Sequence, residues 1–169
     1  MALEHVTRIA NLLESYFSDP TAVGDTTDLV SLPLNLGLAH GTGANQADLR
    51  WSSAGRSLGA SAGENIDLNG SLTYKGANIN FARVKILGIR TPAANPNNLI
   101  IGNASSAGWQ GPFGALTHTY AIPPGMVQGF AKVDATGWPV TATTADILRI
   151  LNGGAGTVTY DICIIGCSA

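Results

Sequence analysis

The sequence predicts a mainly β protein: a jelly-roll-like antiparallel β-sandwich, preceded by an N-terminal amphipathic helix and an extended arm. Two observations carry this prediction. From residue 47 onward, short segments rich in β-branched and aromatic residues recur about every ten residues. Turns containing Gly or Pro, such as LNGS, IPPG and DATG, separate them. Short strands at regular spacing, separated by turns that contain Gly or Pro, favour two packed sheets.

Residues 3–17 carry apolar residues at helical spacing. Val6, Ile9, Leu13 and Tyr16 recur every three or four positions, and the pattern stops at Ser-Asp-Pro. The spacing predicts one amphipathic helix of about four turns. Because so short a helix is not stable alone, its apolar stripe must dock on another surface.

Residues 21–46 have few charges and several glycines, and Pro33 interrupts an otherwise strand-like run. We expect an extended arm here, with room for one edge strand. Such an arm reaches across a neighbouring molecule or wraps back on its own domain, and the sequence leaves both open. The chain therefore divides into residues 1–46, the helix and arm, and residues 47–169, the β-sandwich domain.

Ten strands are expected in the sandwich. They cover residues 47–52, 56–60, 64–68, 80–90, 98–102, 116–122, 126–133, 140–143, 146–151 and 157–165. The NGGAG sequence before the last strand lacks the Lys-Ser/Thr pair of a phosphate-binding loop, so we interpret it as a hairpin turn.

The last strand is unusually apolar for a chain terminus. Alternation places four residues on one face: Val158, Tyr160, Ile162 and Ile164. From Cys163 onward the other face also becomes apolar, so we expect this end to be covered by another part of the fold or by another copy, with Ile165 as a candidate contact. Cys163 and Cys167 lie about 13 Å apart in an extended strand, too far for a disulfide, and we interpret them as small core residues.

Six further residues are candidates for contact with another protein. In residues 80–90, strict alternation puts Phe81, Arg83, Lys85 and Leu87 on one face. Basic residues flanked by bulky apolar ones are typical of an interface with a polar centre, and equally of a solvent-facing surface. Trp109 and Trp138 fall in Gly-containing loops, where a tryptophan stacks on a sugar or packs over the end of a sandwich or into a neighbouring subunit.

Composition favours a protein that works inside an assembly. Only 12% of the 169 residues are charged, about half the usual share, and the net charge is -2. This balance provides no general attraction for nucleic acid or an anionic membrane, and we expect neither as a partner. The first twenty residues lack a signal-peptide core and no run is apolar enough for a membrane helix, so we expect synthesis in the host cytoplasm.

Nothing in the sequence indicates catalysis. The three histidines, His5, His40 and His118, stand in unrelated settings, and no nucleophile, paired-carboxylate or zinc-binding motif is present. Two cysteines without a CxxC pattern do not suggest a metal site. We therefore expect no enzyme activity, no cofactor and no bound metal.

Residues 40–169 resemble a family of small virion structural proteins of tailed bacteriophages. The resemblance is carried best by DATGWPVT, ADILRI and GAGTVTYDICIIG. It implies a capsid decoration or cement protein: a β-sandwich on the head surface that binds the major capsid protein and associates with itself as a dimer or trimer. The alternatives are a tail, neck or fibre component and, in another class, a host-surface lectin.

Overall fold

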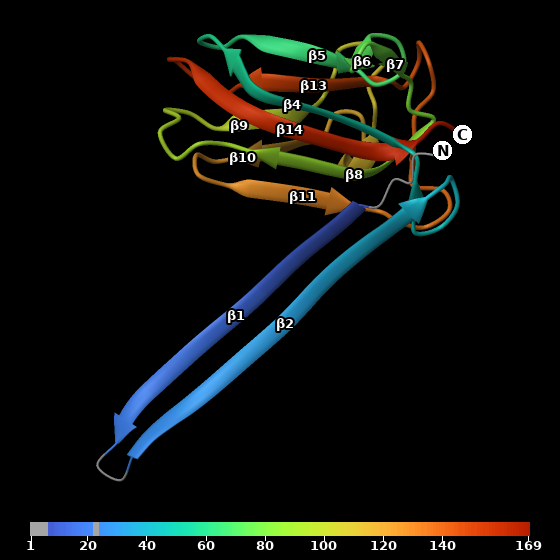
Figure 1. Ribbon diagram of the computed structural model, residues 1–169. Coiled ribbons are helices and arrows are strands. Elements are labelled where there is room, and N and C mark those ends of the chain that lie inside the picture. The colour runs from blue at the N-terminus through green and yellow to red at the C-terminus, as the bar shows by residue number, and fades with distance from the viewer. Residues whose placement is uncertain (1–6, 22–23) are drawn as a thin grey trace.

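The computed structural model describes residues 7–21 and 24–169, with side chains from residue 36 onward. It has two parts, a β-sandwich and a long two-stranded ribbon that projects from one corner of it (Figure 1). The prediction of a mainly β protein with an antiparallel sandwich is confirmed. In the described part of the chain, no helix is long and apolar enough to span a membrane.

Two antiparallel sheets form the sandwich. The front sheet has the order β11 (Val127–Ala131), β8 (Arg83–Arg90), β14 (Val158–Cys167) and β4 (Leu49–Leu58), and the short β12 (Trp138–Pro139) also pairs with β8. The back sheet has the order β10 (Thr119–Ile122), β9 (Leu99–Gly102), β13 (Ile147–Asn152) and β5 (Gly63–Asp67). The last strand, β14, is thus interior, with β8 on one side and β4 on the other.

The pairing is nested from the ends of the domain inward. The first strand pairs with the last, β4 with β14, and the next pairs are β5 with β13, β8 with β11, and β9 with β10. A long antiparallel hairpin rolled over on itself produces this order, which is that of an eight-stranded jelly roll. Smaller elements join the strands: β6 (Leu72–Tyr74), β7 (Ala77–Ile79) and the 3-10 turn η1 (Gly111–Phe113).

Several strand boundaries differ from those expected. Residues 47–52 and 56–60 belong largely to one strand, β4, because the SAGR sequence forms a bulge rather than a turn. Gly55 adopts a positive φ of 65° there, and its N–H donates to Asp161 Oδ1 over 2.8 Å. Residues 140–143 form no strand. The short β6–β7 hairpin was not anticipated.

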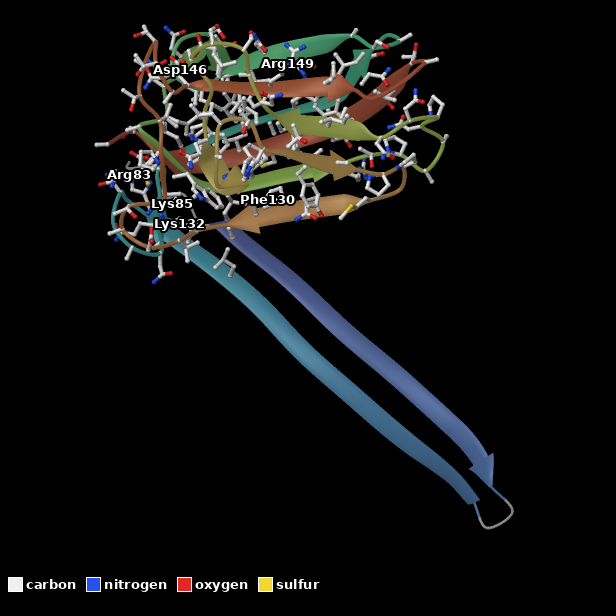
Figure 2. The ribbon with its side chains drawn as sticks, turned by 180° about the vertical axis from the view of Figure 1, so that it is seen from behind. Arg83, Lys85, Phe130, Lys132, Asp146 and Arg149 are labelled. Carbon is white, nitrogen blue, oxygen red and sulfur yellow. The ribbon has the colours of Figure 1, made fainter. Side chains whose placement is uncertain are left out.

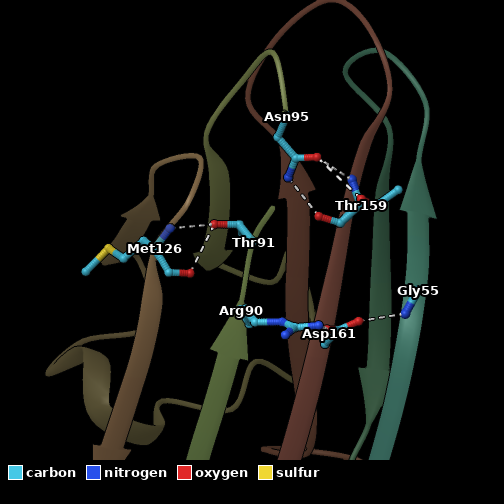
Figure 3. Close-up of polar contacts among 7 residues, drawn as sticks. All are labelled: Gly55, Arg90, Thr91, Asn95, Met126, Thr159 and Asp161. Carbon is cyan, nitrogen blue, oxygen red and sulfur yellow. Dashed lines mark hydrogen bonds and ion pairs between the residues drawn. The ribbon is translucent and has the colours of Figure 1, made fainter. Parts of the chain in front are cut away.

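The core lies between the two sheets. The inward-facing residues alternate along the strands, as in Ile162 and Ile164 of β14 and Leu148 and Ile150 of β13, all at most 2% exposed. At one corner Gly166 lets β8 come close, because a Cβ on it would lie 2.1 Å from Arg83 O. Polar side chains at the edge of the core hold neighbouring segments together by hydrogen bonds. Asn95 pairs with the backbone of Thr159 like an extra strand residue, through bonds of 2.7 and 2.9 Å (Figure 3).

The ribbon, here called the arm, consists of β1 (Thr7–Thr21) and β2 (Gly24–His40), paired from Thr7 opposite Leu38 to Thr21 opposite Gly24. The extended arm is as expected, but the structure differs from the helix expected over residues 3–17: residues 7–17 are strand, and residues 1–6 lie outside the described residues. The periodicity of residues 3–17 alone does not reveal β2, the next strand, which satisfies the backbone hydrogen bonds of β1.

The base of the arm packs on the outer face of the front sheet. Leu38, and Ala47 of β3 (Gln46–Ala47), are buried against Ile86 and Ile165, and Leu36 packs beside them. The apolar outer face of the β14 end, which the sequence showed to need a cover, is therefore covered by the same chain. Cys167 is buried and Cys163 is half-buried, and both are free thiols, as expected.

Candidate interaction surface

Five of the seven residues expected to contact another protein are covered by their own fold, which corrects that prediction. Phe81, Lys85 and Leu87 have no exposed surface, while Trp109 and Ile165 are 3% and 4% exposed. Ile165 is covered by the arm base. Arg83 and Trp138 remain half-buried.

The error in β8 came from assuming strict alternation. The pairing of β14 with β8 shifts register between Ile165, opposite Ile86, and Gly166, opposite Val84. Lys85 is the extra residue of this bulge. Val84 and Leu87 are three positions apart and would lie on opposite faces of a regular strand, but because of the extra residue both reach the core cluster. A bulge of this kind leaves no periodic signal in one strand.

Lys85 fastens the arm base to the sandwich. Its Nζ donates to Asp134 O and, over 3.4 Å, to Gly43 O just beyond β2. Figure 2 shows it near Arg83 and Lys132, close to where the arm leaves the sandwich. Arg83 in turn binds the C-terminal Ala169 O, with a Nε–O distance of 2.7 Å. The residues expected to form a polar interface centre instead hold loops and chain ends in place.

We expect Lys85→Met to lower the free energy of unfolding by about 1–3 kcal/mol, because the carbonyls of Gly43 and Asp134 lose a charged donor in a buried setting. Lys132→Met is the matched control: Lys132 is partly exposed and lies 3.8 Å from Asp134 Oδ2. Urea unfolding measures both. Equal stability of the two variants would show that the buried ammonium does not hold the arm base.

An aromatic cluster closes one end of the sandwich. Trp109 meets Phe113 and Trp138 edge-to-face at 6.4 and 6.3 Å, and its Nε1–H donates to Pro139 O over 3.0 Å. Packing over the sandwich end, one of the three roles left open for this tryptophan, is the one the structure gives. An open hollow of about 420 Å³ beside the cluster is lined by residues that include Phe113, His118 and Tyr120, and none of its lining residues is acidic.

The outer face of the front sheet carries a shallow, mostly apolar trough of about 320 Å³. It is lined by Ser52, Ser53, Ala54, Gly88, Ile89, Arg90, Val127, Asp161, Ile162 and Cys163. Val127, at its rim, is 73% exposed, an unusual exposure for a large apolar side chain in this fold. Cys163 connects the trough to the arm base, since it also packs against the cluster that contains Leu38.

One ion pair borders the trough (Figure 3). Arg90 Nε and Nη2 donate to Asp161 Oδ2 over 2.8 and 2.5 Å, while Asp161 Oδ1 accepts the Gly55 N–H. The Gly55 amide, and then Arg90, hold the pKa of Asp161 below its ordinary value of 3.8. The two charges neutralise each other, so the trough as a whole offers a nearly uncharged surface.

This pair gives a pH prediction. Because the pKa of Asp161 is lower in the folded than in the unfolded chain, its contribution to stability is complete above about pH 4 and is lost as the pH falls through the folded pKa. We expect Asp161→Asn to melt lower than the wild type at neutral pH and at nearly the same temperature near pH 2. Thermal melts across this range test it, and a parallel pH dependence in both proteins would contradict it.

A second charged network ties the two sheets together. Arg56 Nε lies 3.1 Å from both Glu64 Oε1 and Tyr160 Oη, and Tyr160 donates to Glu64 over 2.5 Å. Burial raises the pKa of Glu64, but the hydrogen bonds from Arg56 and Tyr160 outweigh it, and the net shift is downward. Burial, then the bond to Glu64, raises the pKa of Tyr160, which stays protonated. Arg56, Glu64 and Tyr160 are thus each hydrogen-bonded to the other two.

Metal binding finds no support in the described part of the chain. No three His, Cys, Asp or Glu residues there gather closely enough to hold an ion. The buried Asp146 uses one oxygen to accept the Thr143 N–H, and its Oδ1 has no protein partner. A single carboxylate oxygen without a second ligand does not make a metal site.

The arm presents two different faces. Directly opposed residues of a β-ribbon lie on the same face, so the β1–β2 register sorts the side chains. One set of opposed register positions holds eight apolar residues, Ile9, Leu13, Phe17, Val30, Leu32, Leu34, Leu36 and Leu38, and seven polar ones, Thr7, Asn11, Ser15, Asp19, Thr21, Thr26 and Asp28. The other face mixes Arg8, Glu14, Ser18, Thr27, Ser31 and Asn35 with fewer apolar residues. The two sets therefore hold equal numbers of polar residues, and the first set includes Leu36 and Leu38, which pack at the arm base.

Comparison of the chain with models of protein families, with curated proteins and with solved structures finds no match. The candidate surface is therefore interpreted from its own geometry.

Proposed function

We propose that this chain is a virion structural protein of a bacteriophage, a decoration or cement protein that binds the lattice of the major capsid protein and stabilises the head. The observation that carries the proposal is the long two-stranded arm that projects from a jelly-roll sandwich. The resemblance of residues 40–169 to small phage virion proteins points the same way.

The arm needs a surface beyond its own domain. An isolated two-stranded ribbon is marginally stable in water. Beyond Leu36 and Leu38, the described strands place no sandwich strand beside the arm: β1 pairs with β2 alone. An assembly in which the arm lies against a neighbouring subunit supplies the missing support.

Binding of this kind stabilises a capsid by mass action. A protein that binds the closed lattice and not the free subunits shifts the equilibrium toward the closed form. The small share of charged residues suits a subunit whose surface is largely covered by neighbours. The rigid jelly roll supplies the exposed body, and the arm supplies the reach between neighbouring subunits.

Removal and add-back of the protein test this function. Phage particles made without the chain should release their DNA at a lower temperature than complete particles, and adding the purified chain should restore the difference. Particles that lack it but show unchanged head stability, with defects confined to tail attachment or adsorption, would move the protein to the tail, neck or fibre.

The lectin alternative depends on the loop tryptophans. Trp109 is buried and engaged through its Nε1–H, which leaves the half-buried Trp138 as the stacking candidate. A glycan screen of the wild type and Trp138→Ala separates the classes. Under the proposed function we expect no glycan binding by either protein.

A further inference from the structure

Four strands form the outer edges of the two sheets, and they differ in how they are protected. Charged side chains, prolines and bulges keep an open edge from pairing with other strands. β4 contains two arginines and a bulge, β5 contains two acidic residues, and β10 runs into two prolines. β11, with the sequence VQGFA, contains no charged residue, no proline and no bulge. It is the unprotected edge of the sandwich.

Every second residue of β11 turns its backbone groups toward this edge. In an antiparallel ladder, residues that bond to the neighbouring strand alternate with residues whose N–H and C=O point away from it. In the register of β11 with β8, the Thr91 N–H donates to Met126 O over 2.9 Å, and the Lys132 N–H donates to Lys85 O over 2.8 Å. The even-numbered residues of β11 therefore bond to β8, and the odd-numbered ones face the open edge.

These odd-numbered residues, Val127, Gly129 and Ala131, are exposed, and no backbone group in the described part of the chain bonds to them on that side. The Gln128 side chain of the same strand donates to Gly129 O over 3.0 Å. The arm base lies beyond the end of the strand, where the Asn45 N–H bonds to the chain two residues after β11. Figure 1 shows β11 as the outermost strand on its side of the sandwich.

The side chains along β11 also lack a covering layer. Val127 is 73% exposed, more than any other large apolar side chain among the described ones, and lies on the outer face at the trough. On the inner face, Phe130 meets Tyr120 edge-to-face at 5.4 Å, and both line the open hollow of about 420 Å³. Open backbone groups, an exposed valine and an aromatic hollow thus occur along one strand.

We propose that two copies of this chain pair along β11, antiparallel about a two-fold axis at Gly129, and so join their front sheets into one. The free N–H and C=O groups require an extended backbone as the occupant. A second β11 suits the site because it carries no charge, so that pairing with itself brings no like charges together. Two-fold symmetry makes identical strands antiparallel, with each outward residue exchanging hydrogen bonds with the other copy.

This register gives each side chain a neighbour. On the outer face, Val127 lies opposite the partner's Ala131, within the 4.5–5.5 Å or so that separates opposed Cβ atoms. On the inner face, Phe130 lies opposite the partner's Gln128, beside the hollow. The N–H of the partner's Gly129 replaces the Gln128 amide as the donor to Gly129 O. No group of β11 that faces the edge is then left without a partner.

The size of the contact predicts a weak dimer. Five residue pairs give a ladder about 17 Å long, and two sheets about 10 Å apart with their outward side chains are about 20 Å thick. Such a contact buries roughly 800–1,200 Å² in total, at the low end of specific interfaces. The pairing goes beyond the proposed function, and it is expected of the free protein in solution without a capsid.

Charges placed at the two-fold axis test the pairing. A Cβ on Gly129 meets nothing within 4 Å and its φ is not positive, so Gly129→Lys and Gly129→Glu both fit the single chain. In the dimer each puts two like charges directly opposite each other, which destabilises a strand pair. In sedimentation equilibrium from about 10 µM to about 1 mM, the full-length wild type should associate, and each variant should associate at least tenfold more weakly.

An equimolar mixture of the two variants is the decisive sample. A mixed dimer places one Lys opposite one Glu, so the mixture should associate nearly as tightly as the wild type. The matched controls are Gly59→Lys and Gly59→Glu, at an exposed glycine where a Cβ also meets open space; both should associate like the wild type. A monomeric wild type, charge variants at Gly129 that associate like it, or a mixture that does not recover would overturn the pairing.

Amide hydrogen exchange checks the register and the fold in the same samples. Raising the wild-type concentration should slow exchange at Val127, Gly129 and Ala131, whose N–H groups face the edge. In Gly129→Lys these positions should stay unprotected, while the core amides should be protected as in the wild type. A wild type that associates without slower exchange at Val127 and Ala131 would overturn the pairing along β11.

The pairing and the proposed function fail separately. A wild type that is monomeric in solution and still stabilises heads would overturn the pairing and support the function. Particles that do not contain the chain would contradict the function, whereas a dimer measured in solution with the purified chain would still support the pairing.

Discussion

A chain that ends before Thr157 does not fold. It loses β14, which lies between β4 and β8 and contributes Val158, Tyr160, Ile162 and Ile164 to the core. Loss of one large core side chain costs about 2–5 kcal/mol. The combined loss of these four is as large as the 5–15 kcal/mol or so by which a whole domain is usually stable. Circular dichroism should show no cooperative thermal transition.

The control for this truncation removes only Ser168 and Ala169. Both are exposed, and their contacts are surface hydrogen bonds to Asp48 and Arg83. We expect a shift in unfolding free energy below about 1 kcal/mol. A soluble, cooperatively melting chain without residues 157–169 would contradict the central place of β14.

Trp109→Ala should lower the free energy of unfolding by about 3–5 kcal/mol, the cost of emptying a large aromatic site in a core. The indole fills the end of the sandwich, meets two aromatic rings edge-to-face and donates to Pro139 O. Urea unfolding measures the change. The half-buried Trp138, replaced by Ala, should lose clearly less.

This result bears on function as well as on stability. If Trp109 were a ligand-binding residue exposed in solution, its replacement would leave stability almost unchanged and abolish binding. An unfolding free energy within about 0.5 kcal/mol of the wild type would therefore contradict its role as a core residue.

Most of the sandwich could be predicted from the sequence because each strand carries its own alternation and its own turn residues. The nature of β14 was visible for the same reason: its second face becomes apolar at Cys163, and the structure places the arm base over Ile165. Free Cys163 and Cys167 followed from their spacing alone.

The features that were missed depend on partners far away in the chain. The bulge at Gly55 depends on Asp161, and the one at Lys85 depends on Ile165 and Gly166 of β14. Because the extra residue at Lys85 separates Arg83 from Leu87, Leu87 was assigned to the surface and lies in the core; Phe81, also in the core, precedes β8 and a bend at Ala82. The apolar spacing in residues 7–17 suits a helix as well as a strand, and only the register with β2 separates them.

The trough illustrates a different limit. Gly88 and Gly129 are far apart in sequence, and neither stands at a turn, so nothing local marks them. Their adjacency becomes visible only when β8 and β11 pair and place them side by side.

The central claim, that this chain is a structural subunit of a phage head, is tested most directly by its copy number in purified particles. Quantitative mass spectrometry on separated head and tail fractions gives this number relative to the major capsid protein. We predict that the chain travels with heads in a fixed, high ratio to that protein. A few copies per particle, or co-migration with tails, would contradict the account.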